Sequence, residues 1–64
     1  MSLSENLNKI AKEKNISMYR IAKDGELSMS YVWDICNGKR ENPSLSVLRK
    51  LSKALEVNIE ELIG

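Results

Sequence analysis

The sequence lacks the residues that usually stabilise small proteins through disulfide bonds or bound metal ions. Its 64 residues include no His, no Phe and a single cysteine, Cys36. One cysteine cannot form an internal disulfide, and without His or a second Cys a zinc site is not plausible. The commonest general base of enzymes is missing as well. We therefore expect no metal, no other cofactor and no catalytic activity.

Long apolar segments are also missing. No apolar run approaches the roughly 20 residues that cross a membrane. The first residues lack the basic and apolar regions of a signal peptide. The sequence therefore predicts a cytoplasmic protein with no membrane partner. A domain this small also offers little room for a cleft, so no small-molecule substrate is expected.

The size of the chain limits its stability. We expect one domain over residues 1–64. A domain this short buries only about 60% of the surface that its unfolded chain exposes. With no disulfide or metal available, stability has to come from tight helix packing or from self-association.

The net charge of +1 is small, but the charges are unevenly distributed. All ten Lys and Arg residues precede Ala54 together with six acidic residues, whereas three acidic residues follow it, which gives +4 before and −3 after. An acidic end turned away from a phosphate backbone is compatible with modest, salt-sensitive DNA binding. The basic residues nearer to the backbone would be Lys39, Arg40, Arg49 and Lys50. An ordinary solvated surface is the alternative, and charge alone favours it.

Apolar residues at helical spacing and polar N-cap residues divide the chain into five helices. Ser2 and Glu5 have the spacing of a capping box, which starts the first helix. The expected helices run over about Leu3–Lys14, from the N-cap Ser17 to about Lys23, from the N-cap Ser28 to about Cys36, after Ser44 and after Asn58. No segment has the alternating pattern of a strand. The expected fold class is therefore all-α.

The apolar faces of these helices predict the core. The expected core residues are Leu7, Ile10, Ile16, Ile21, Ala22, Leu27, Val32, Ile35, Leu48, Leu51, Leu55, Val57 and Leu62. Tyr19 and Tyr31 are also expected to pack inward. Trp33 is expected to point outward, because its neighbours Val32 and Ile35 take core positions.

The segment from Ile16 to Ser44 carries the most functional information, because it places two short helical patterns around a tight turn and adds a basic loop. Its motifs and those that follow are Ile16-Ser17, Ile21-Ala22, Leu27-Ser28, Asn37-Gly38-Lys39-Arg40, Pro43-Ser44-Leu45 and the stretch from Lys53 to Leu62. Together they resemble the helix-turn-helix of lambda-repressor-like regulators, the Cro and phage-repressor (XRE) type. The resemblance implies a compact five-helix DNA-binding domain.

The resemblance further implies a sequence-specific, repressor-like transcriptional regulator with the third helix, about Ser28 to Cys36, in the major groove. Met29 and Ser30 would face bases, and Asp34 would face the groove. Tyr31 would reach a phosphate through its hydroxyl or pack beside the second helix. The other expected DNA-binding positions, most of them at phosphates, are Met18, Ser28, Asn37, Lys39, Arg40 and Ser44.

The same resemblance implies a homodimer on a two-fold-related operator in double-stranded DNA. Such a dimer would place two third helices about 34 Å apart, one turn of duplex. The residues expected at the dimer surface are Val47, Ile59 and Ile63. These side chains could instead close the core.

Three features differ from the family pattern. Met18, Met29 and Trp33 stand at exposed positions where the family commonly has Gln at the start of the second helix and polar residues along the third. Glu26 takes the place of the turn glycine, and because a non-Gly residue at positive φ costs about 1 kcal/mol, we expect the turn to use Gly25 instead. Ala11 and Cys36 stand where many members pair an Arg with a Glu. Replacing both partners of a buried ion pair by apolar groups is often neutral, so we expect these two side chains to lie close together, with neither fully exposed.

A group of exposed apolar side chains leaves a second function open. The group of Met18, Tyr19, Met29, Tyr31 and Trp33 has the composition that is enriched at protein interfaces. The alternative to a DNA-binding regulator is therefore a protein-interaction module that uses this face, with Trp33 as an interface residue, as an antitoxin or a repressor partner would.

Overall fold

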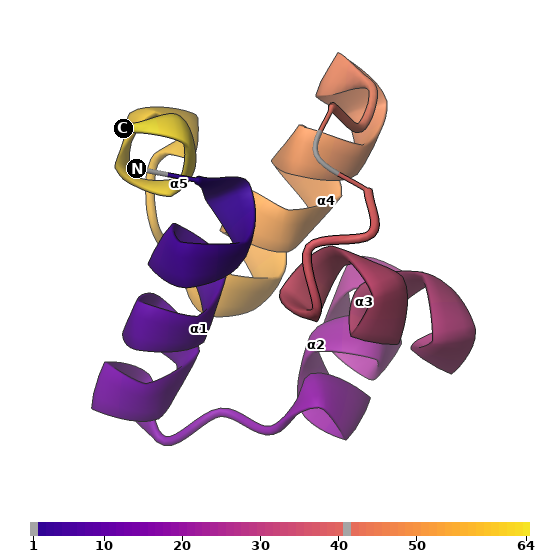
Figure 1. The fold of residues 1–64 in the computed structure, drawn as a ribbon. Coiled ribbons are helices and arrows are strands. Elements are labelled where there is room, and N and C mark those ends of the chain that lie inside the picture. Colours follow the sequence, from indigo (N-terminus) through magenta and orange to yellow (C-terminus); the bar gives the residue numbers. More distant parts are fainter. Residues whose placement is uncertain (1, 41) are drawn as a thin grey trace.

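The computed structural model describes residues 2–40 and 42–64, and this part of the chain forms five α-helices (Figure 1). The helices are α1 (Leu3–Lys14), α2 (Met18–Gly25), α3 (Met29–Cys36), α4 (Leu45–Leu55) and α5 (Ile59–Ile63). The all-α fold class is confirmed, and the first and third helices have the expected bounds. None of the described helices has the length and apolar character needed to cross a membrane.

Serine N-caps begin the first four helices, as the sequence predicts. The hydroxyl oxygens of Ser17, Ser28 and Ser44 each accept a hydrogen bond from the backbone N–H three residues later, at 3.2, 3.1 and 3.3 Å. At the start of α1, Ser2 Oγ accepts from the Glu5 backbone at 3.2 Å, and Glu5 accepts from the Ser2 backbone at 3.1 Å. These bonds satisfy backbone donors that a helix leaves without an internal partner.

The turn between α2 and α3 differs from the prediction. Glu26, with φ of 56°, is the left-handed residue, whereas Gly25 is the last helical residue of α2 and is buried. A Cβ atom at Gly25 would stand 3.2 Å from the backbone oxygen of Lys50 and 3.6 Å from the Cβ of Ala54. The glycine is therefore used for the close approach of α2 to α4, and the expectation that it forms the turn is wrong.

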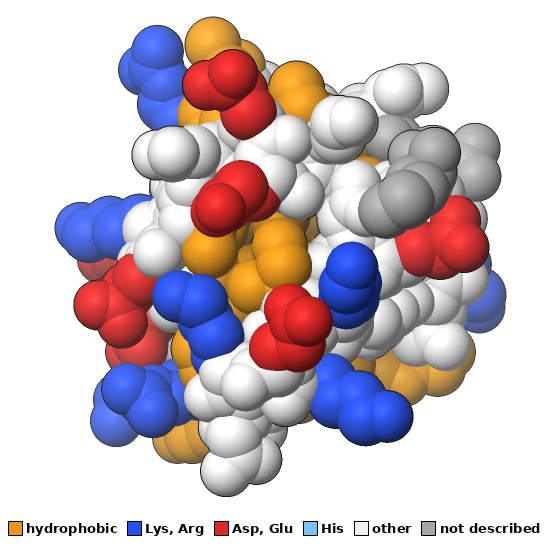
Figure 2. All heavy atoms as spheres, turned by 90° about the vertical axis from the view of Figure 1, so that its left-hand side faces the viewer, with side chains coloured by type: hydrophobic (Ala, Val, Ile, Leu, Met, Phe, Trp, Pro, Cys, Tyr) orange, Lys and Arg blue, Asp and Glu red, His pale blue; other side chains and the backbone are white. Residues whose placement is uncertain are grey.

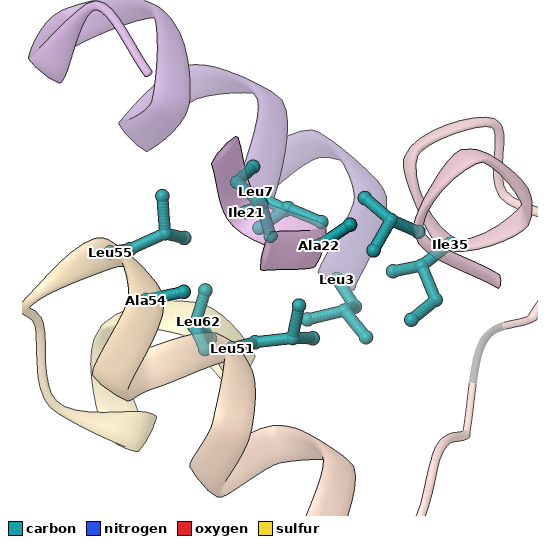
Figure 3. Packing of buried hydrophobic residues seen from close by; sticks show 10 residues of the cluster. Leu3, Leu7, Ile21, Ala22, Ile35, Leu51, Ala54, Leu55 and Leu62 are labelled. Atoms are coloured by element: carbon teal, nitrogen blue, oxygen red, sulfur yellow. The ribbon is translucent and has the colours of Figure 1, made fainter. Parts of the chain in front are cut away.

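Side chains from all five helices meet in one buried cluster (Figure 3). The expected core residues that are buried are Leu7, Ile21, Ala22, Val32, Ile35, Leu51, Leu55 and Leu62. Leu3 and Ala54 are also buried, although they are not among the expected core residues. The other expected core residues, Ile10, Ile16, Leu27, Leu48 and Val57, are half-buried around this cluster. Three of them lie in connections between helices, where solvent reaches one side.

Two asparagines of α1 tie that helix to distant parts of the chain. The buried Asn6 donates from Nδ2 to the carbonyl oxygen of Leu62 in α5, at 2.7 Å. Asn8 donates from Nδ2 to the carbonyl oxygen of Cys36, at the end of α3, at 2.8 Å. Helix α1 therefore fixes α5 on one side and the end of α3 on another.

Ala11 and Cys36, the positions of the missing ion pair, are both half-buried and pack against the core. Neither side chain is fully exposed, as expected for apolar replacements. Burial raises the pKa of the Cys36 thiol. The thiol therefore stays neutral and behaves as a small apolar side chain against the core.

Candidate nucleic-acid interface

Helix α3 has one buried side and one uncovered side. Val32 and Ile35 are fully buried, whereas Met29 is 44% and Trp33 43% exposed. Ser30 is exposed as well. Residues 29, 30, 33 and 34 share one side of a helix because they repeat at intervals of about one turn. We call this side, with Met29, Ser30, Trp33 and Asp34, the reading face.

The loop after α3 turns back along that helix. Gly38, with φ of 77°, makes the turn, and the backbone N–H of Lys39 donates to the carbonyl oxygen of Asp34 at 2.8 Å. Asn37 donates from Nδ2 to the carbonyl oxygen of Trp33, also at 2.8 Å. These bonds hold the basic end of the loop beside the reading face.

Both basic side chains of the loop contact α3. The Lys39 ammonium lies 4.9 Å from the centre of the Trp33 ring. The Arg40 guanidinium lies 4.7 Å from the centre of the Tyr31 ring, and its Nε is 3.6 Å from Asp34 Oδ2. Cation–π contacts of this kind are worth about 0.5–1 kcal/mol at exposed sites. The loop thus brings two positive charges to the reading face and offsets the carboxylate of Asp34.

The start of α2 differs from the prediction. Met18 is half-buried and packs against the core, whereas the sequence places it at an exposed position. Tyr19 is 64% exposed instead of packing inward, and Tyr31 is half-buried as expected. The core side of α2 carries Met18, Ile21, Ala22 and Gly25, whose helical spacing turns Tyr19 outward. The five-residue Met and aromatic group is therefore not one exposed patch.

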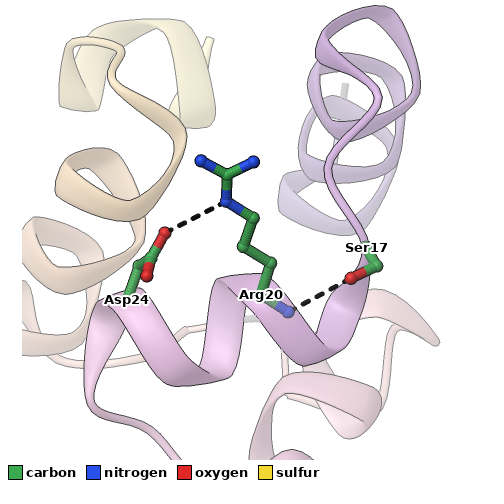
Figure 4. Close-up of polar contacts among 3 residues, drawn as sticks. All are labelled: Ser17, Arg20 and Asp24. Carbon is green, nitrogen blue, oxygen red and sulfur yellow. Dashed lines mark hydrogen bonds and ion pairs between the residues drawn. The ribbon is translucent and has the colours of Figure 1, made fainter.

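A second ion pair lies on α2, away from the reading face. Arg20 Nε is 3.4 Å from Asp24 Oδ2, one helical turn further on, and the Arg20 backbone donates to the N-cap Ser17 (Figure 4). Both side chains also line a hollow of about 370 Å³ with residues of α4. Arg20 therefore belongs to the junction of α2 and α4.

The face formed by α1 and α5 has a different character. Side chains of both charge signs surround a small apolar area there (Figure 2). A hollow of about 290 Å³ is lined by Asn6, Lys9, Ile10, Glu13, Lys14, Val57 and Glu61. The acidic residues Glu56, Glu60 and Glu61 are exposed, and α5 lies on the opposite side of the molecule from α3 (Figure 1). The acidic end is thus turned away from the reading face.

The expected dimer residues are unevenly exposed. Val47 and Ile59 are half-buried, and Ile63 is 55% exposed. Leu45, which the helical spacing assigns to the core side of α4, is also 55% exposed, because it is the first residue of that helix. The exposure of Leu45 could not be predicted from helical spacing, because the spacing does not show where along α4 the core cluster ends.

The fold and the reading face define a helix-turn-helix domain, and the comparisons with known proteins agree. Residues 6–64 match the Cro/C1-type HTH DNA-binding domain family. The chain belongs to this family, and its fold is that of a DNA-binding domain of transcriptional regulators. The resemblance seen in the sequence motifs is confirmed.

Similarity to individual proteins supports the assignment to this family. The chain is 33% identical over all of its 64 residues to the immunity repressor protein of Bacillus phage phi105, of which it spans 44%. Its structure is similar to the restriction-modification controller protein C.AhdI from Aeromonas hydrophila (TM-score 0.88, 31% identity, 95% of this chain and 91% of that one). It is also similar to the Bacillus subtilis master regulator for biofilm formation SinR, solved in complex with DNA (TM-score 0.87, 28% identity, 94% and 95% of the two chains).

Proposed function

We propose that this domain is a sequence-specific, repressor-like regulator that inserts α3 into the major groove of a DNA operator. The observation that supports it best is the reading face: Met29, Ser30 and Asp34 are accessible on α3, and the loop holds Lys39 and Arg40 beside them. A helix of this kind reads bases through its accessible side chains, while flanking polar groups hold phosphates.

The proposed roles follow from position and chemistry. Ser30 would donate or accept at a base edge, and Met29 would contact a thymine methyl group. Met18 is half-buried, so its proposed role is to support the first turn of α2. The residues proposed to contact or approach phosphates are Ser28, Tyr31, Asn37, Lys39 and Ser44. A serine that accepts a capping bond still has its own proton to donate to a phosphate oxygen.

We also propose that the domain works as a homodimer on an operator with two-fold symmetry. Exposed Ile63 and half-buried Ile59 and Val47 support an apolar contact between two copies. The dimer would set two copies of α3 about 34 Å apart, so that both enter the same side of the duplex. Sedimentation of the chain with and without duplex tests this; a 1:1 complex at saturation would rule the dimer out.

Selection from a pool of randomised duplexes, followed by titration of the selected duplex at increasing salt, tests DNA binding. We expect the affinity to fall steeply with salt, because each phosphate contact releases counterions. Lys39→Ala should weaken binding to all sequences and reduce the salt slope by about 1. Arg20→Ala removes an equal charge at the α2 and α4 junction and serves as the control. No selected duplex even at about 50 mM salt would contradict the proposal.

A protein-interaction module is the second candidate, and the exposure of Met29 and Trp33 favours it. These side chains stand one turn apart and are of types enriched at protein interfaces. Failure to select any duplex, together with a change in Trp33 emission when a partner protein is added, would support this candidate over the first.

A further inference from the structure

Asp34 and Arg40 present an acceptor and a set of donors side by side at the reading face. Arg40 Nε lies 3.6 Å from Asp34 Oδ2. The Arg40 side chain is 56% exposed and the Asp34 side chain 31%. Both groups can therefore be reached by a large ligand. Because the contact with Asp34 uses Nε, the two Nη groups of the guanidinium keep donors for another partner.

Tyr31 limits the directions in which the guanidinium can point. The Arg40 Cζ lies 4.7 Å from the centre of the Tyr31 ring, while Asp34 holds the Nε edge. Tyr31 and Asp34 are both on α3, and Tyr31 is half-buried, so the support itself is rigid. A side chain that is held on two sides loses less conformational entropy when it binds. This favours a partner that accepts hydrogen bonds in a fixed direction over an unspecific contact with negative charge.

We infer that Asp34 and Arg40 together read one C·G base pair in the major groove. Asp34 accepts a hydrogen bond from the N4 amino group of cytosine, and the Nη groups of Arg40 donate to O6 and N7 of guanine. This inference rests on the proposed DNA-binding function and adds to it the base pair that this part of the reading face recognises. It assigns Arg40 to a base edge instead of a phosphate.

The spacing of the pair fits this assignment. Cytosine N4 and guanine O6 are partners in a Watson–Crick hydrogen bond and so lie about 2.9 Å apart. A carboxylate and a guanidinium that contact one another, as Asp34 Oδ2 and Arg40 Nε do at 3.6 Å, can therefore reach neighbouring groups of one base pair. An A·T pair fits less well. Its thymine offers Arg40 one acceptor beside a methyl group, and its adenine N7 is an acceptor next to the amino group that Asp34 would need.

Base selection with the full chain tests the inference. We expect duplexes selected from a randomised pool to carry C·G at one fixed position of each half-site. Exchanging that pair for A·T should lower the affinity about 5- to 150-fold. Arg40→Ala should bring this ratio close to one, and Asp34→Ala, which removes the acceptor for cytosine N4, should lower it. Tyr31→Phe keeps the aromatic ring and should preserve the ratio, whereas Tyr31→Ala should reduce it.

A matched control uses the other exposed ion pair. Arg20→Ala and Asp24→Ala make the same charge changes beside α4 and should leave the ratio unchanged. If Arg40→Ala weakens binding to the C·G and A·T duplexes equally, Arg40 is a phosphate contact and the inference is overturned, while DNA binding stands. If the full chain selects no duplex at all, both the inference and the proposed function fail.

Discussion

The backbone of Gly25 in α2 lies against the backbone of Lys50 in α4, so that a Cβ atom at Gly25 would stand 3.2 Å from the Lys50 carbonyl oxygen. This approach brings α2 onto the buried side of α4, next to Ala54. Since α2 begins the helix-turn-helix, the position of the reading face relative to the core depends on this contact.

Gly25→Ala should therefore destabilise the domain, even though alanine favours helices. Overpacking against a backbone atom costs about 1–3 kcal/mol, and the gain in helix propensity returns about 1 kcal/mol. We expect a net loss of about 1 kcal/mol in the free energy of unfolding, measured by urea denaturation. An increase in stability would show that α2 and α4 can separate at little cost.

Glu26→Gly should have the opposite effect. Glu26 has φ of 56°, a conformation that costs a residue with a side chain about 1–2 kcal/mol, whereas glycine adds about 0.5–1 kcal/mol of entropy cost on folding. We expect urea denaturation to show a gain of about 0.5–1 kcal/mol. Glu26→Ala keeps the strained conformation and should not stabilise the domain; equal gains in both variants would contradict this explanation.

Asn6→Ala should loosen the attachment of α5. The substitution removes the buried hydrogen bond to the Leu62 carbonyl oxygen and leaves that oxygen without its partner. A loss of about 2 kcal/mol is expected, which lowers the melting temperature by about 4–8 °C per kcal/mol in a domain of this size. Asn8→Ala removes a bond at an exposed side chain and should cost less. Equal losses would argue against the role of burial.

The Glu5 carboxylate should make stability depend on pH in the acid range. Hydrogen bonds from the Ser2 backbone and hydroxyl lower the pKa of Glu5 below its ordinary value of 4.5. A lowered folded-state pKa means that the stabilisation is fully present above pH 4.5 and is lost as the pH falls through the folded-state value. The melting temperature of the Glu5→Gln variant should therefore lie below that of the unaltered chain at neutral pH. The two melting temperatures should converge in acid. A difference between Glu5→Gln and the unaltered chain that stays the same at every pH would contradict this explanation.

Local signals in the sequence predict the helices well, because an N-cap serine and the N–H group it binds are only three residues apart. The turn could not be predicted in the same way. Whether Gly25 or Glu26 takes the left-handed conformation depends on the distance between α2 and α4, which local spacing does not contain. Likewise, a short helix such as α2 does not reveal which of Met18 and Tyr19 faces the core, since one residue of rotation exchanges them.

The candidate site was predictable in its residues but not in their contacts. The motif predicts that Asp34, Lys39 and Arg40 face DNA. That the loop folds back at Gly38 and sets Arg40 against Asp34 and Tyr31 follows only from the three-dimensional path of the chain. This path changes the expected chemistry, because an isolated carboxylate on the reading face becomes part of a donor and acceptor pair.

The proposed function requires that the reading face of α3 and the loop beside it contact DNA. The most direct measurement is a titration of the isotopically labelled chain with the selected duplex, followed by the backbone amide signals in NMR. We predict large shifts for residues 29–34 and 37–40 and small shifts on the face of α1 and α5. Shifts confined to α1 and α5, or none at a duplex concentration that saturates binding, would contradict the account.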